Sequence, residues 1–157
     1  MTDNVTTFQI PPVEKSILVP CAPDRAFRAF TAEIGQWWPL STHSVAQGQA
    51  RGVAIEPRIG GRVFETDAAG GESDWGRVLE WAPPHRLVMT WHPGRTAASE
   101  QTVEINFVAE GADTRVILRH HGWENLGIEA ARARDLYNNG WDMVLAGRYG
   151  DFCKQLR

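Results

Sequence analysis

Cysteine is scarce in this chain of 157 residues, and the two that occur, Cys21 and Cys153, lie near its opposite ends. Such a pair forms neither a disulfide framework nor the paired spacing of a zinc site. We expect two reduced, partly buried thiols, as is usual in the cytosol. The sequence therefore predicts neither a disulfide nor a bound metal.

Long apolar runs are absent too, and no stretch approaches the length that a helix needs to cross a bilayer. The first residues, Met1 to Gln9, are polar and lack the basic-then-apolar layout of a signal peptide. Both absences predict a cytoplasmic protein that does not insert into a membrane.

The charge is balanced rather than basic, with 16 Lys and Arg residues against 19 Asp and Glu residues and a net charge of −3. The arginines are scattered along the chain and form no basic stripe. Such a sequence gives no electrostatic reason to bind nucleic acid or anionic lipid. We therefore expect no nucleic-acid partner.

Motifs that carry catalysis or hold cofactors are missing as well. The chain contains no His-Glu-x-x-His, no Cys-x-x-Cys and no Gly-x-Ser-x-Gly. The glycine pairs at 60–61 and 70–71 are not followed by the Lys-Ser/Thr of a phosphate loop. Asp74, Glu80 and Glu104 are interpreted as solvated charges on strands. No catalytic residue and no cofactor is predicted.

Tryptophan, in contrast, is abundant and is the most informative feature of the composition. Each indole buries a large apolar area but carries an N–H group that needs an acceptor. A core of this size rarely hides so many indoles, so some are expected to line a cavity or a groove. The seven residues are Trp37, Trp38, Trp75, Trp81, Trp91, Trp123 and Trp141.

The length and an apolar fraction of 43% predict one domain with one core, over residues 13–157, after an extension over residues 1–12. A strand is predicted at 13–19, then a short amphipathic helix at about 24–33 and a helical or turn segment at 36–40. Turn residues then separate six more strands, at 53–56, 62–66, 75–81, 86–92, 102–109 and 114–121.

The last two of these strands alternate between apolar and polar residues. Val103, Ile105 and Phe107 share one face, and Val116 and Leu118 share the matching face of the next strand. Alternation of this kind is typical of an antiparallel sheet with one wet face.

Residues from about 124 to 156 are predicted to form one long helix with an apolar stripe. Its interior glycines, Gly140 and Gly147, are expected to permit close packing on the sheet. Together the elements predict an α+β helix-grip fold, a curved antiparallel sheet of about seven strands around the long C-terminal helix, with two short helices after strand one. The stripe consists of Tyr137, Trp141, Val144, Leu145, Arg148 and Phe152.

Residues 75–91, Trp-Gly-Arg-Val-Leu-Glu-Trp-Ala-Pro-Pro-His-Arg-Leu-Val-Met-Thr-Trp, resemble a signature of bacterial proteins similar to the heat-shock-protein-90 ATPase activator. These proteins belong to the START/SRPBCC superfamily, and the resemblance extends over about residues 13–156. Supporting matches lie at 60–65, 102–107, 114–123 and 140–141.

The resemblance implies a cavity between the sheet and the long helix, which in this superfamily holds lipids, polyketides or other apolar molecules. Some related proteins assist the chaperone, a role in the stress response, and one relative protects against an enediyne antibiotic. The eukaryotic co-chaperone carries a separate N-terminal domain for which this chain has no room, which speaks against a chaperone partner.

Aromatic residues from separate segments are predicted to line that cavity, because small-molecule sites have apolar walls with few polar groups. The alternative is that the same side chains only fill the core. Residues 42–44, which follow the tandem Trp37-Trp38, are expected near the mouth of the cavity. The predicted ligand-binding residues are Trp37, Trp38, Phe64, Trp91, Phe107, His120, Trp123, Tyr137 and Trp141.

Only one of two adjacent histidines can face inward, because neighbouring residues on a strand point to opposite faces. The register with Val116 and Leu118 predicts that His120 is inward and His121 outward. An inward His120 is either a hydrogen-bonded core residue or a group that orients the polar end of a ligand. Together with Glu65 it could also supply acid–base chemistry.

Three functions remain open. The leading interpretation is non-enzymatic binding of an apolar or amphipathic small molecule. The second is an enzyme of the polyketide cyclase or hydrolase kind that uses His120 and a carboxylate. The third is a chaperone-linked protein-interaction module, which would expose an apolar patch rather than enclose a cavity. A homodimer through an exposed edge strand or an aromatic patch is a further prediction.

Overall fold

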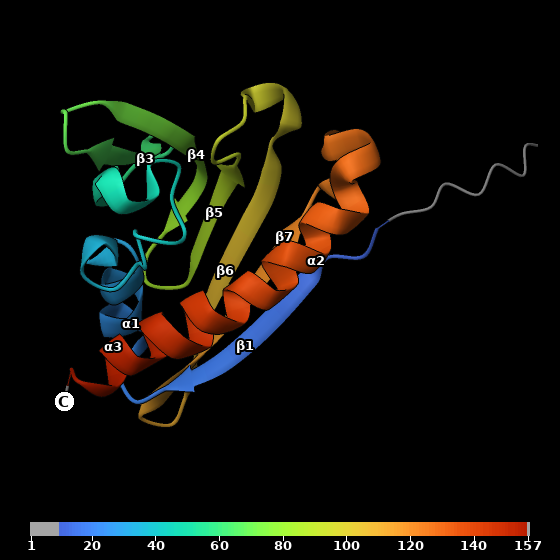
Figure 1. Cartoon of the computed structure of the whole chain (residues 1–157). Coiled ribbons are helices and arrows are strands. Elements are labelled where there is room, and N and C mark those ends of the chain that lie inside the picture. Colours follow the sequence, from blue (N-terminus) through green and yellow to red (C-terminus); the bar gives the residue numbers. More distant parts are fainter. Residues whose placement is uncertain (1–9, 157) are drawn as a thin grey trace, which may run out of the picture.

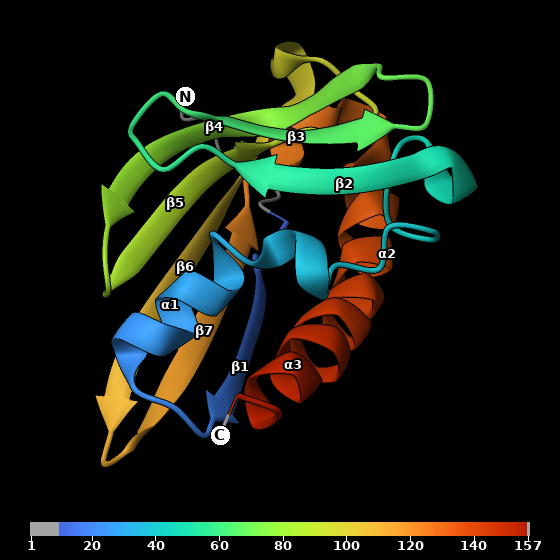
Figure 2. The same ribbon diagram turned by 90° about the vertical axis from the view of Figure 1, so that its left-hand side faces the viewer.

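A curled antiparallel sheet wraps one side of a long C-terminal helical region. The computed structural model describes residues 10–156, so the predicted extension lies outside the described residues over 1–9. In Figure 1 the C-terminal helices, orange to red, run diagonally across the sheet, and Figure 2 shows β2 and β3 bending over one end of it. The predicted α+β helix-grip fold is confirmed.

The order of the elements follows the sequence pattern closely. The strands are β1 (Val13–Val19), β2 (Ala50–Ile55), β3 (Arg62–Asp67), β4 (Glu72–Ala82), β5 (Arg86–Trp91), β6 (Gln101–Glu110) and β7 (Asp113–His121). They pair in the order β1-β7-β6-β5-β4-β3-β2, and every pair is antiparallel. The predicted strands differ from these only by a few residues at their ends.

Short helical pieces connect the strands. Helix α1 (Pro23–Phe30) and a 3₁₀ turn (Ile34–Gln36) follow β1, where two short helices were expected. Further 3₁₀ turns at Gln47–Gln49 and Ala97–Ser99 precede β2 and β6. Within the part of the chain that the structure describes, no helix is long and apolar enough to span a membrane.

The concave face of the sheet forms the core. Val103, Ile105 and Phe107 on β6 are at most 2% exposed, while the residues between them face solvent on the convex side. His120 on β7 is fully buried and the adjacent His121 is not, which confirms the predicted register.

The C-terminal region is less regular than the predicted single helix. A 3₁₀ segment (Trp123–Glu129) leads into α2 (Ala130–Trp141), a π-helical segment (Asp142–Tyr149) and α3 (Gly150–Lys154). A π turn closes i→i+5 hydrogen bonds and therefore holds more residues than an α turn. Buried positions in this stretch can consequently recur every four residues without drifting around the helix.

The wider turn corrects the predicted stripe. Arg148 is exposed, and Tyr149 takes its place in the core at 0% exposure. Trp141, Leu145 and Cys153 continue the same spacing of four, and all are at most 2% exposed. The prediction of Arg148 as a buried position is wrong because it assumes the α-helical 3.6 residues per turn throughout.

Tyr149 and Cys153 fasten the last helix to the start of the chain. The Tyr149 hydroxyl donates a 2.7 Å hydrogen bond to the carbonyl oxygen of Ala26 on α1. The Cys153 thiol lies beside that of Cys21, and burial raises the pKa of Cys153 to about 12. Both thiols are free, so two cysteines from opposite ends of the chain meet as thiols.

The interior glycines do not pack as expected. A Cβ atom at Gly140 would meet the His43 ring at 3.7 Å, so Gly140 adjoins the loop before β2 rather than the sheet. A Cβ atom at Gly147 would meet nothing within 4 Å, so its predicted packing is wrong. The glycine that approaches the sheet is Gly150, where a Cβ atom would lie 3.6 Å from Ile17 on β1.

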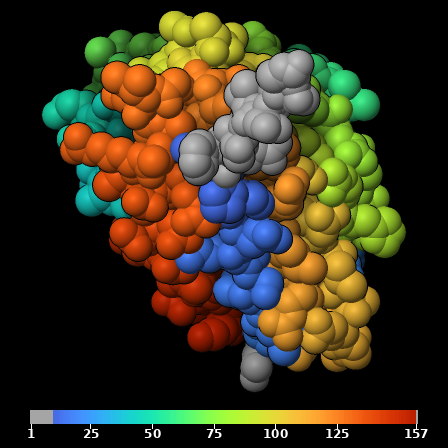
Figure 3. All heavy atoms as spheres, turned by 90° about the vertical axis from the view of Figure 1, so that its right-hand side faces the viewer, coloured from blue at the N-terminus to red at the C-terminus, as the bar shows by residue number. Residues whose placement is uncertain are grey.

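The edge of the sheet at β1 reaches the surface. Figure 3 shows β1, in blue, between the C-terminal helices, in orange, and strands β6 and β7, in gold. Lys15 on this strand forms an ion pair with Asp142 at 2.8 Å. A homodimer through this edge stays a prediction.

Gly76→Ala is expected to be strongly destabilising. A Cβ atom at Gly76 would lie 1.8 Å from the carbonyl oxygen of Thr90 on the neighbouring strand, so backbone must move. We expect the free energy of unfolding in urea to fall by about 3 kcal/mol or more. The control, Gly147→Ala, fills open space in a helix and should raise it by up to about 1 kcal/mol. Equal effects of the two changes would contradict this packing.

Candidate functional site

A cavity of about 360 Å³ lies between the sheet and the C-terminal helices. Strands β4 and β5 form one wall, α2 and the π-helical segment form the opposite wall, and residues 42–45 close one side. Among the described residues that line it, none is Lys, Arg, Asp or Glu. The aromatic lining residues are Trp38, Trp75, Trp91, Tyr137 and Trp141.

The four indole rings form one contiguous cluster. The ring centroids of Trp75 and Trp91 are 5.5 Å apart, and Trp38 lies 5.2 Å from Trp75. Trp141, from α2, lies 5.8 Å from Trp91 and 5.9 Å from Trp38. The rings meet at tilted or edge-to-face angles, the arrangement that their quadrupoles favour. The cavity is therefore bounded by flat, rigid aromatic surface.

The indole N–H groups differ in one respect. Three of the four donate to protein acceptors, which lie five, ten and 21 residues away in the sequence, and each bond fixes the orientation of its ring. The Trp91 N–H is buried and has no hydrogen-bond acceptor among the described residues. The three bonds are Trp38 to the His43 carbonyl oxygen at 2.7 Å, Trp75 to Glu65 at 2.7 Å and Trp141 to His120 Nδ1 at 2.9 Å.

Glu65 is a buried carboxylate that fixes the loop side of the cavity. It is 1% exposed, and it accepts hydrogen bonds from the backbone N–H groups of Val45 at 2.6 Å and Ala46 at 2.9 Å as well as from Trp75. Three bonds to a charged acceptor offset the cost of taking it out of water. The geometry therefore gives Glu65 a positioning role instead of an acid–base role.

His120 is a hydrogen-bonded core residue. Its Nδ1 accepts the Trp141 N–H, so the proton is assigned to Nε2, which donates to Gln101 Oε1 at 3.1 Å. The ring stacks on Trp123 at 4.2 Å between centroids. Burial lowers the pKa of His120 to about 3, and nearby His121 adds to this effect. A neutral imidazole with both nitrogens engaged supports Trp141 and does not line the cavity.

Four of the nine predicted ligand-binding residues line the cavity, namely Trp38, Trp91, Tyr137 and Trp141. The others do not. Trp37, Phe107 and Trp123 are at most 5% exposed and fill the core away from it, as the alternative interpretation had it.

Phe64 lies on the convex face of β3. It alternates with Val63 and Glu65, which are both buried, and the Arg62 guanidinium lies 4.1 Å from the centre of its ring. The prediction that Phe64 faces the cavity is wrong. The side chain that β3 buries at this point is Glu65 instead, and the N–H donors around its carboxylate compensate the cost of that burial.

Trp75 is the aromatic lining residue that the sequence-based prediction of the site missed. The register between β3 and β4 shifts next to it, at the pairs Val63–Gly76 and Phe64–Asp74. A bulge changes which residues of a strand face inward, so simple alternation along β4 does not reveal Trp75. Residues 42–44, expected near the mouth, do line the cavity.

His43 is the one imidazole among the residues that line the cavity. Its Nδ1 lies 2.7 Å from Thr42 Oγ1. Burial lowers the pKa of His43, and the charge of Arg148 lowers it further. A neutral imidazole at the cavity wall can act as a hydrogen-bond partner or as a base.

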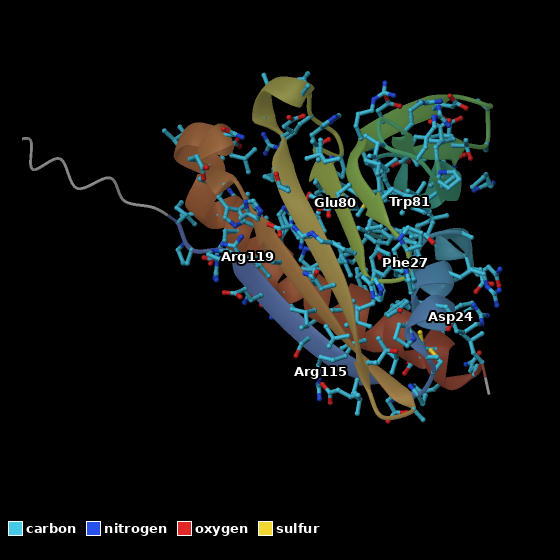
Figure 4. The ribbon with its side chains drawn as sticks, turned by 180° about the vertical axis from the view of Figure 1, so that it is seen from behind. Asp24, Phe27, Glu80, Trp81, Arg115 and Arg119 are labelled. Atoms are coloured by element: carbon cyan, nitrogen blue, oxygen red, sulfur yellow. The ribbon has the colours of Figure 1, made fainter. Side chains whose placement is uncertain are left out.

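The carboxylates interpreted as solvated strand charges lie in ion pairs on the convex face. Glu80 and Glu104 both bind Arg86 at 2.8 Å, and Glu104 also meets Arg119 at 3.3 Å. Figure 4 shows Glu80 and Arg119 on this side of the sheet. Burial raises the pKa of Glu104, but the bonds from Arg86 and His121 outweigh it, and the pKa is lowered.

A second hollow, of about 520 Å³, lies between α1 and the β4–β5 turn. Figure 4 shows Phe27 and Trp81 side by side there, with Asp24 on the outside of α1. The two ring centroids are 5.1 Å apart, and Asp24 and Arg28 on its rim are exposed. None of the predicted ligand-binding residues lines this hollow.

Comparison with known proteins gives one family. The model of the family described as activator of Hsp90 ATPase homolog 1-like protein matches residues 20–147, which confirms the resemblance noted in the sequence. No curated protein matches the chain. Among solved structures, an anthrahydroquino-γ-pyrone synthase is 34% identical over 91% of this chain and 97% of its own, with a TM-score of 0.65.

Two more distant structures show a likeness of fold alone. CalC from Micromonospora echinospora, a self-sacrificing resistance protein, is 24% identical, with 92% of this chain and 95% of its own covered and a TM-score of 0.65. A protein of Mesorhizobium loti is 17% identical, with 93% and 98% covered and a TM-score of 0.66.

Burial of neutral His120 makes the stability of the protein depend on pH. The unfolded chain takes up this proton near the ordinary pKa of 6.5, whereas the folded chain takes it up only near pH 3. Stability is therefore complete above about pH 6.5 and falls as the pH drops, by up to about 1.4 kcal/mol per pH unit. In His120→Gln this slope should be smaller between about pH 5 and 6.5, where carboxylates titrate little. Urea denaturation series at several pH values measure it, and equal slopes in both proteins would refute the assignment.

Proposed function

The chain belongs to the family of activator of Hsp90 ATPase homolog 1-like proteins, and within that family we propose that it binds an apolar or amphipathic small molecule between its sheet and its C-terminal helices. One observation carries the proposal, namely the four indole rings that surround a space of about 360 Å³. A space of this size lies in the range of small-molecule sites.

The chemistry of the walls supports an amphipathic ligand. The indoles offer flat apolar surface on which a ring system can stack. Thr42, His43 and Ser44 bring hydroxyl and imidazole groups to one side of the cavity, where they can bind the polar end of such a ligand. We do not propose a chaperone-linked interaction module, because the four indole side chains are at most 8% exposed and line the cavity instead of forming an exposed patch.

A second candidate is an enzyme of the polyketide cyclase kind. The observation that favours it is the 34% identity to a synthase over most of both chains. The His120 of the sequence-based hypothesis has both nitrogens engaged, so a base in this cavity would have to be His43. Fold and family alone do not assign the reaction.

Gly140→Leu is designed to block the cavity. Gly140 lines it from α2, so a leucine side chain there occupies part of the space without disturbing the sheet. We expect the affinity for N-phenyl-1-naphthylamine, an uncharged fluorescent probe, to fall by about tenfold or more. The matched control is Gly147→Leu, on the same helical region but facing open space. Saturable binding that Gly140→Leu leaves unchanged, or no binding by the folded protein, would sink the proposal.

A turnover assay separates the two candidates. The wild-type protein is incubated with the precursor that the similar synthase converts to an anthrahydroquino-γ-pyrone, and products are followed by mass spectrometry. If the protein only binds, the precursor is recovered unchanged. Pyrone formation that His43→Asn slows about 100-fold or more, with affinity for the fluorescent probe retained, would establish the enzyme instead.

A further inference from the structure

Two thiols from opposite ends of the chain meet where the last helix contacts the first. Cys21 lies between β1 and α1, and Cys153 lies on α3. The Cys153 thiol is in hydrogen-bond contact with the Cys21 sulfur. Figure 4 shows two sulfur atoms, in yellow, together near Asp24 at the start of α1. Both thiols are free, and neither residue lines the cavity or the second hollow.

The backbone on both sides of this contact is held in place. The carbonyl oxygen of Cys21 accepts a 2.7 Å hydrogen bond from the Thr114 hydroxyl at the start of β7. Four residues before Cys153, the Tyr149 hydroxyl donates to the carbonyl oxygen of Ala26 on α1 at 2.7 Å. The last helix cannot slide along α1 without breaking that second bond, so the two sulfur atoms stay close to each other.

The two thiols differ in reactivity. Cys21 is partly exposed, whereas Cys153 is fully buried. Burial raises the pKa of both thiols, that of Cys153 to about 12, but the hydrogen bond from Cys153 and the charge of Arg25 limit the rise for Cys21. Because the thiolate is the form that attacks an oxidant, Cys21 is the thiol that reacts from solvent. Cys153 then lies within reach as the second thiol.

We propose that Cys21 and Cys153 form a redox pair that a hydroperoxide oxidises to an intramolecular disulfide, which links the start of α1 to the last helix. The Cys21 thiolate attacks the O–O bond and becomes a sulfenic acid, while the other oxygen leaves as an alcohol, or as water when the oxidant is hydrogen peroxide. The Cys153 sulfur then forms the S–S bond, and its proton leaves with the sulfenic hydroxyl as water. Two electrons pass from the sulfurs to the peroxide, and a dithiol reverses the reaction.

The disulfide closes a ring that contains most of the domain. Residues 21–153 include α1, α2 and the strands from β2 to β7. A crosslink over so long a loop restricts the unfolded chain strongly, which stabilises the folded state. Reducing conditions keep the two thiols apart as free groups, and exposure to a peroxide converts them to the more stable crosslinked form. The pair is therefore a switch that turns oxidant exposure into a gain of stability.

Oxidation of the full chain tests the proposal. Reduced protein is treated with hydrogen peroxide, unfolded, labelled with N-ethylmaleimide and digested for mass spectrometry. We expect an unlabelled, linked pair of peptides around residues 21 and 153, lighter by about 2 Da than the two reduced peptides together. The urea midpoint of the oxidised monomer should exceed that of the reduced protein by about 1 M, and dithiothreitol should restore the lower value.

Two variants, each checked for folding by circular dichroism, assign the steps. In Cys153→Ala the reaction should stop at a Cys21 sulfenic acid that dimedone traps, with no rise of the urea midpoint. In Cys21→Ser the buried Cys153 should lose its thiol about tenfold more slowly than the wild-type pair does. Wild-type protein that keeps both thiols in peroxide while the urea-unfolded chain loses them, or that ends as sulfinic acids or as linked dimers, would overturn the proposal.

Discussion

Every indole that this protein buries needs an acceptor for its N–H, and the arrangement of the cavity follows from how that need is met. Trp75 is held by the carboxylate of Glu65, which also holds the backbone of Val45 and Ala46. Trp141 is held by a neutral His120. Each of these bonds ties an indole to a residue on a different element, Trp75 on β4 to β3 and Trp141 on α2 to β7, and so fixes the orientation of the ring. The hydrogen bonds of the indole N–H groups therefore hold the aromatic wall of the cavity in place.

The two buried ionisable side chains next to the cavity, Glu65 and His120, have structural roles. Glu65 and His120 are the groups that a search for acid–base partners selects first, and both are fully occupied by hydrogen bonds that orient aromatic rings. The hydrogen bonds to those partners offset the free-energy cost of removing both groups from water. The polar side chains that line the cavity are those of residues 42–44 and Tyr137, so ligand recognition in the proposed function depends on them.

The π-helical segment sets which side chains of the C-terminal region face the sheet and the cavity. With more residues in each turn, Trp141, Leu145, Tyr149 and Cys153 stay on one face, and the Tyr149 hydroxyl can reach α1. In a regular α-helix, the face toward the sheet would drift with each turn, and Arg148 would approach the core. The irregular geometry thus keeps a charge out of the interior and Trp141 at the cavity.

From the sequence alone one can predict the seven strands along the chain, the inward side of β6 and β7, the burial of His120 and the family, because alternation with a period of two and a contiguous signature are local properties. The inward position of Glu65, the outward position of Phe64 and the contact of Trp75 with Trp91 at the cavity emerge only when the whole chain has folded. Those outcomes depend on N–H donors from a loop some twenty residues away and on a bulge in β4, which no local pattern encodes. The physical reason is that a buried polar group is placed by its partners, and the partners are brought together by the fold.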